Sequence, residues 1–146
     1  MSEENSHVSV KPSESVSKEA EKRVESKTGR KGEPEFHLTE QMRRLSTPWG
    51  IALARARQID PGSLGPGIIL DAAVGSGLQL IAYSSVLKRP SLGVEIDGNV
   101  AVLCAANMFS VAGKDDIQRS MDRVVIGDST DSVGVMNEFW SSLRES

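Results

Sequence analysis

The sequence predicts an α/β fold with parallel strands, and two sets of observations support that prediction. Short runs rich in branched apolar residues lie at 68–70, 92–96 and 123–126. Two segments with apolar residues at helical spacing, 78–88 and 97–114, separate these runs. Strand, helix, strand, helix, strand is the order of a right-handed βαβαβ unit. We therefore expect one parallel sheet with helices packed against it.

A helix is predicted ahead of the first strand, beginning at Thr47. Threonine is a good N-cap, and Pro48 suits the first helical position, where its missing N–H costs nothing. Four apolar side chains at helical spacing form the expected inward face: Trp49, Ala52, Leu53 and Ala56. The turn-rich stretch at 60–67 ends this helix.

The helix after the second strand has a long inward face. Asp97 or Asn99 can cap its start, and Gly113 can end it. Its inward positions are Val100, Leu103, Cys104, Asn107, Met108 and Val111. Cys104 is the single cysteine, so we expect a buried small hydrophobe, with no disulfide and no cysteine-based zinc site.

The first 35 residues have a different composition from the rest of the chain. They contain seven serines, eight acidic and seven basic residues, and no aromatic residue. Such a segment buries too little apolar surface to offset the entropy of ordering it. We expect 1–35 to be a disordered tail and 36–146 to be the folded domain.

Composition also limits where the protein acts. The net charge of −3 argues against a protein that coats nucleic acid. The N-terminus has neither the basic nor the apolar region of a secretory signal, and no apolar run approaches the ~18 residues of a membrane span. We expect a soluble cytoplasmic protein with no membrane contact and no metal site.

Acidic residues lie at the carboxyl ends of all three predicted strands. Asp71 follows the first strand and precedes a turn with Gly75 and Gly77, Glu95 lies 24 residues later, and Asp128 follows the third strand. Ligands of such folds bind beyond these strand ends, and glycines let a ligand approach the backbone. A carboxylate at the second strand can accept hydrogen bonds from both hydroxyls of a ribose. The pattern predicts a nucleotide site.

Each acid also has a structural alternative. Asp71 can cap the helix after the turn, Glu95 can be a surface acid, and Asp128 can belong to an ordinary turn. Their common register at the strand ends favours the ligand-binding interpretation.

The glycine pattern excludes two common nucleotide sites. The G-x-G-x-x-G fingerprint would require glycine where Leu80 stands, and no P-loop string occurs. Asp71 would repel a pyrophosphate but suits a cationic amine. We expect a site for an adenosine with a positively charged, amino-acid-like tail. Leu80 and Asp71 disfavour a nicotinamide-dependent oxidoreductase.

These residues resemble a known family. "ILDAAVGSG" at 69–77 resembles motif I of class I S-adenosylmethionine-dependent methyltransferases, usually D/E-x-G-x-G-x-G, with Ala73 in place of the first glycine. "LGVEID" and "VVIGDSTD" are similar to the second and third motifs. The resemblance implies a Rossmann-like three-layer methyltransferase fold with S-adenosyl-L-methionine as cofactor. It implies a cofactor site formed by Asp71, Ala73, Gly75, Gly77, Glu95, Ile96, Asp128 and Ser129.

The same resemblance implies separate roles for these residues. Asp71 would orient the methionine amino group, and Gly75 and Gly77 would pass under the cofactor. Glu95 would bind the ribose, and Asp128 would lie near the adenine.

A narrower resemblance concerns the methyl acceptor. "QMRRLSTPWGIALARARQI" at 41–59 is similar to the helix before the cofactor motif in trimethylguanosine-synthase-like and THUMP-associated RNA methyltransferases, which implies an RNA substrate. Trp49 is then either a core residue or a base-stacking platform. Arg43 and Arg44 either contact RNA phosphate or form a solvated helix face.

The sequence after Asp128 lacks the family's catalytic loop. No Asn/Asp-Pro-Pro-aromatic string follows, so the catalytic residues are unknown, and Phe139 and Trp140 indicate an amphipathic helix instead. We expect the fold to be truncated after the third strand, which would leave the edge of the first strand bare. We expect a partner chain or a second copy there. The alternative function is a catalytically inactive S-adenosylmethionine-binding or protein-interaction module.

Overall fold

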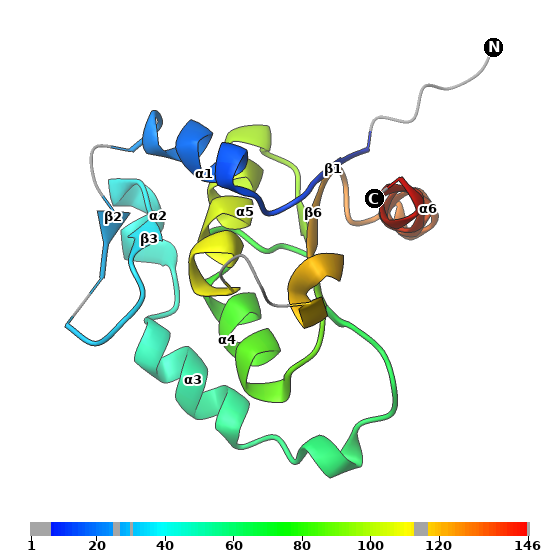
Figure 1. The fold of residues 1–146 in the computed structure, drawn as a ribbon, viewed down its shortest axis with the longest axis horizontal. Helices are drawn as coiled ribbons and strands as arrows, with labels where there is room; N and C mark the ends of the chain where they lie inside the picture. The colour runs from blue at the N-terminus through cyan, green and yellow to red at the C-terminus, as the bar shows by residue number, and fades with distance from the viewer. Residues whose placement is uncertain (1–6, 25–26, 30, 113–116, 146) are drawn as a thin grey trace.

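The computed structural model describes residues 7–24, 27–29, 31–112 and 117–145, and it is an α/β fold around a four-stranded sheet (Figure 1). Its parallel strands are β4 (Ile69–Asp71), β5 (Ser91–Glu95) and β6 (Arg123–Ile126), in the spatial order β6-β5-β4. They agree with the predicted runs to within one residue at each end. The α/β class and the three strands are therefore confirmed. A fourth strand, β1 (Val8–Val10), pairs antiparallel with β6 and makes the sheet mixed.

Helices cover both faces of this sheet, as two neighbouring residues of β6 demonstrate. Val124 packs with helices α4 (Leu78–Leu87) and α5 (Gly98–Ala112) on one face. Val125 packs with helix α6 (Ser132–Arg144) on the other. Successive side chains of a strand point to opposite faces, so a strand covered on both sides is apolar at consecutive positions. This explains the unbroken apolar runs in the sequence.

Helix α3 (Trp49–Arg57) precedes the parallel strands in the sequence and packs against α4. Its predicted inward face is confirmed by the burial of Trp49, Ala52 and Ala56 and the partial burial of Leu53. The predicted cap is wrong: Pro48 is the N-cap, and the Thr47 hydroxyl donates to the side chain of Gln79 at 3.2 Å. A residue before proline avoids helical geometry, which moves the helix start past Thr47.

Short elements join the N-terminal region to α3. Strands β2 (Lys27–Thr28) and β3 (Phe36–His37) form an antiparallel pair, and helix α2 (Glu40–Leu45) follows. The Thr39 hydroxyl caps α2 by accepting from the Met42 N–H at 3.1 Å. Single 3₁₀ turns, Pro61–Ser63 and Ile117–Met121, precede β4 and β6.

The structure corrects the expectation of a disordered tail over 1–35. Within the described part of that segment, β1 extends the sheet and helix α1 (Glu14–Glu21) packs on α5. Ala20 of α1 is fully buried against Leu103 and Ala106 of α5. Composition underestimates the order of such a segment for two reasons. An edge strand such as β1 pairs through its backbone, whatever its side chains. Helix α1 can pack through a side chain as small as that of Ala20, because α5 supplies most of the apolar surface of the contact. Residues 1–6, 25–26 and 30 of the predicted tail lie outside the described residues.

Helix α5 has the inward face predicted for it. Leu103, Cys104, Asn107 and Met108 are buried, and Val100 and Val111 are partly buried. Asp97 caps the helix, because its Oδ1 accepts from the N–H of Asn99 at 2.9 Å. Gly113, the predicted end, lies outside the described residues.

Two further findings bear on the surface. In the described part of the chain β4 pairs with β5 alone, so its other side is an edge of the sheet, where Leu70 is 55% exposed. None of the helices in the described ranges combines the length and apolar character of a membrane span.

Candidate functional site

A cavity of about 640 Å³ lies between the glycine turn and helix α2. Its floor is the turn after β4 and the carboxyl end of β5, and its roof is the segment from Thr39 to Thr47. All eight predicted cofactor residues lie in the described part of the chain. Four of them line this cavity: Asp71, Ala73, Gly75 and Glu95.

The turn rests on the neighbouring strand. The N–H of Val74 donates to the carbonyl of Val94 at 3.0 Å, so the turn continues the pairing of β4 with β5. Gly75 has a φ of +56°, which favours glycine, and a side chain added there would meet open space. Gly93 lies beneath the turn, where an added Cβ would be 2.8 Å from a methyl group of Val74. The absence of a side chain at Gly93 therefore allows the turn to sit close to β5.

Glu95 is held in place by two backbone N–H groups. Its Oε1 accepts from Gly75 at 3.2 Å and its Oε2 accepts from Asp97 at 2.9 Å. Each carboxylate oxygen has two acceptor positions, so one remains on each oxygen for a ligand. Two adjacent hydroxyls, as on a ribose, match this arrangement. The same bonds also give Glu95 a structural role, because they attach the glycine turn to the carboxyl end of β5.

Asp71 is half-buried on the wall of the cavity, and its Oδ1 accepts from the Ala73 N–H at 3.0 Å. It does not cap α4, because the N-cap of that helix is Gly77. Ala73 does not have a positive φ, because Lys88 is the one described non-glycine residue that does. The backbone at Ala73 therefore accepts an alanine methyl group without strain. The departure from the family's glycine pattern thus causes no backbone strain.

The other four predicted cofactor residues do not line the cavity. Gly77 serves packing, because a Cβ on it would lie 2.6 Å from the Cys104 Sγ. The Ile96 side chain is 74% exposed, and Ser129 is exposed. Asp128 accepts from the N–H and the hydroxyl of Thr130 at 2.9 and 2.7 Å, and these bonds lower the pKa of its carboxyl. In this structure Asp128 stabilises its own turn.

A buried polar cluster that was not predicted connects the turn to the N-terminal region. The Ser76 hydroxyl shares a 2.7 Å hydrogen bond with that of Ser46, at the end of α2. The Asn107 Nδ2 donates to the carbonyls of Ser76 and His37, at 2.9 and 3.2 Å. Asn107 lies on the inward face predicted for α5. Because a buried amide requires hydrogen-bond partners, a polar residue at that position indicates a buried polar cluster.

Burial also affects two titratable groups near this cluster. Desolvation lowers the pKa of His37, with a smaller contribution from the positive charge of Lys27. Burial raises the pKa of the Cys104 thiol, so this cysteine is a packing residue rather than a nucleophile.

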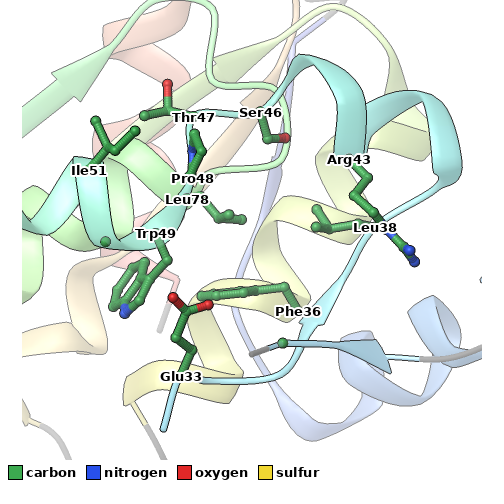
Figure 2. Close-up of a pocket in the computed structure, with 12 residues that line it drawn as sticks. Glu33, Phe36, Leu38, Arg43, Ser46, Thr47, Pro48, Trp49, Ile51 and Leu78 are labelled. Carbon is green, nitrogen blue, oxygen red and sulfur yellow. The ribbon is translucent and has the colours of Figure 1, made fainter. Parts of the chain in front are cut away.

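Figure 2 shows the residues that line a second cavity, of about 590 Å³. Ser46, Thr47 and Leu78 line both cavities and form the wall between them. Trp49 is 9% exposed and its ring centre lies 5.3 Å from that of Phe36, so Trp49 belongs to the core and also borders this cavity.

Comparison with protein-family models, with curated proteins and with solved structures finds no match for this chain. The interpretation of the site therefore depends on its residues and their geometry.

Proposed function

We propose that this chain carries the S-adenosylmethionine-binding part of a Rossmann-like methyltransferase that acts on RNA. One observation supports this most directly. The carboxylate of Glu95 is fixed to the glycine turn through Gly75 and borders the same cavity as Asp71.

The residues present fit this cofactor. The Asp71 carboxylate favours a cationic amino group, Glu95 has one acceptor position on each oxygen for a ribose, and the Gly75 backbone lets the ligand approach closely. When bound, the cofactor supplies an electrophilic methyl group, and the protein contributes by positioning it against the acceptor. The narrower resemblance of residues 41–59 supports RNA as that acceptor.

Titration calorimetry with S-adenosylmethionine and S-adenosylhomocysteine tests the proposal. We expect saturable binding of both by the full chain, and binding weakened about tenfold or more by Glu95→Ala, because bonds to a charged acceptor contribute about 1.5–3 kcal/mol. Glu35→Ala is the matched control, since Glu35 is exposed and borders neither cavity. Absence of heat with the folded protein would contradict the proposal. Absence of heat with NAD is expected, because Leu80 and Asp71 disfavour a nicotinamide site.

The alternative function is an inactive cofactor-binding or protein-interaction module. The exposed Leu70 on the edge strand β4 favours it, because an open strand edge with an apolar side chain can pair with a partner chain or a second copy. Light scattering of the native chain and of Leu70→Lys tests this alternative. A dimer that the substitution dissociates, together with cofactor binding but no methyl transfer to RNA, would favour the module.

A further inference from the structure

We propose that the second cavity binds the base of one unpaired RNA nucleotide, with its phosphate at Arg43. We call this space the Trp49 cavity; the residues that carry the argument are Glu33, Phe36, Arg43, Thr47, Trp49 and Leu78. The inference deepens the proposed function, on which it rests, by assigning a place to one nucleotide of the bound RNA.

The position of the Trp49 cavity suits a nucleotide of the RNA that carries the methyl acceptor. It shares a wall with the cavity of Asp71 and Glu95, formed by Ser46, Thr47 and Leu78. Ser46 bonds to Ser76 and Thr47 bonds to Gln79, so this wall is attached to the glycine turn and to α4. This wall separates a base held on one side of it from a cofactor held on the other, so the base belongs to a nucleotide that positions the RNA and does not itself receive the methyl group.

The lining of the Trp49 cavity suits a flat ring. Phe36 and Trp49 lie tilted at 52° to each other, and Leu38 and Leu78 complete an apolar wall. The volume of about 590 Å³ falls within the range of about 300–1,000 Å³ of small-molecule sites. Bases bind to proteins through contacts with aromatic and apolar side chains of this kind.

The charges at the Trp49 cavity distinguish a nucleotide from other ligands. The Glu33 carboxylate points toward the space beside Phe36 and Trp49, and the Arg43 side chain lies beyond Leu38 from those two rings (Figure 2). A carboxylate inside accepts from the N–H groups of a base and repels phosphate, whereas a guanidinium at the rim binds phosphate. The acidic Glu33 inside the cavity and the basic Arg43 at its rim therefore match a nucleotide, in which a ring with N–H donors is joined to a phosphate.

The chain provides a matched control for each charged residue. Arg44 is the next residue of α2, but it pairs with Glu40 at 3.0 Å and does not border the Trp49 cavity. Glu35 is exposed, two positions after Glu33, and does not border it either. Each control changes the net charge equally and leaves the cavity intact.

Trp49 fluorescence in the Trp140→Phe variant of the full chain provides the readout, because Trp49 is then the single tryptophan. The probe is a short single-stranded oligoribonucleotide of mixed sequence. We expect saturable quenching, with the Kd raised about fivefold or more by Arg43→Ala or Glu33→Ala and less than about twofold by Arg44→Ala or Glu35→Ala. An RNA duplex of the same sequence should bind at least about fivefold more weakly, because its bases are stacked.

Three results would overturn the proposal: no quenching, equal effects of Arg43→Ala and Arg44→Ala, or equal binding of duplex and single strand. Calorimetry with S-adenosylhomocysteine on the same variants separates this inference from the proposed function. Cofactor binding without quenching overturns the RNA site alone. Arg43-dependent quenching without cofactor binding supports the RNA site and contradicts the methyltransferase function.

Discussion

Asn107 of helix α5 binds the glycine turn through Ser76: its Nδ2 donates to the Ser76 carbonyl at 2.9 Å, inside the protein. The same side chain binds His37 of β3, accepting from its N–H at 2.6 Å and donating to its carbonyl at 3.2 Å. One buried amide thus joins three elements that lie far apart in the sequence. The shape of the cavity that Asp71 and Glu95 line depends on this connection, because α2, which follows β3, forms its roof.

Replacing Asn107 by leucine should destabilise the fold and loosen the cavity. The substitution keeps the approximate volume but leaves the carbonyl of Ser76 and the backbone groups of His37 without partners. Each unsatisfied buried group costs about 1–3 kcal/mol, so we expect a loss of at least ~2 kcal/mol in the free energy of unfolding, measured by urea denaturation. Asn137→Leu, on the exposed side of α6, is the control. Equal effects of the two substitutions would contradict the connecting role.

The two glycines of the turn should respond differently to alanine. At Gly77 φ is +89° and a Cβ would lie 2.6 Å from the Cys104 sulfur, so Gly77→Ala should cost about 1–3 kcal/mol of stability for this contact in addition to about 1–2 kcal/mol for the positive φ. At Gly75 the added Cβ meets open space on the wall of the cavity, and the cost is limited to about 1–2 kcal/mol for its positive φ.

Cofactor titration and a double variant test this difference. Gly75→Ala should weaken S-adenosylhomocysteine binding in a protein that remains folded. Cys104→Ala should restore part of the stability lost in Gly77→Ala, because it removes the clashing sulfur. A failure of Cys104→Ala to restore any stability would show that the contact is not the cause.

The stability of the protein should depend on pH through His37. Burial holds its pKa below the ordinary value of 6.5, so between the two values the unfolded chain binds a proton that the folded chain does not. The contribution of neutral His37 is therefore complete above pH 6.5 and is lost as the pH falls toward the lowered pKa. Urea denaturation between about pH 8 and pH 5 measures this change. His37→Gln should flatten this part of the curve, and an unchanged slope would contradict the assignment.

The N-terminal helix should contribute measurably to stability. Ala20 is fully buried between α1 and α5, so Ala20→Glu places a charge against Leu103 and Ala106 and should cost at least about 1–3 kcal/mol. Lys18→Glu, at an exposed position of the same helix, should have little effect. If thermal melts of the two variants coincide, α1 does not pack on α5 in solution.

Local patterns were sufficient for the parallel strands and the main helices. Branched apolar runs, proline and glycine positions, and helical spacing depend on near neighbours, so the sequence displays them directly. The positions of Asp71 and Glu95 at strand ends were predictable for the same reason, since the carboxyl end of a parallel strand is a position that the strand itself defines.

Other assignments depended on contacts between distant segments. Gly77 resembles Gly75 in the sequence, yet Cys104 makes it a packing residue. The first 35 residues resemble a disordered tail, because nothing local indicates that β6 and α5 present surfaces for β1 and α1.

The sequence by itself therefore determined the α/β class, the order of strands and helices, and the acids at the strand ends, because each follows from local periodicity. Only the tertiary structure decided which of those residues share a cavity, that Ser46 and Asn107 attach the N-terminal region to the glycine turn, and that a second cavity lies behind Thr47. Hydrogen bonds and packing between residues remote in the chain cannot be derived from spacing, because they require the fold to bring their partners together.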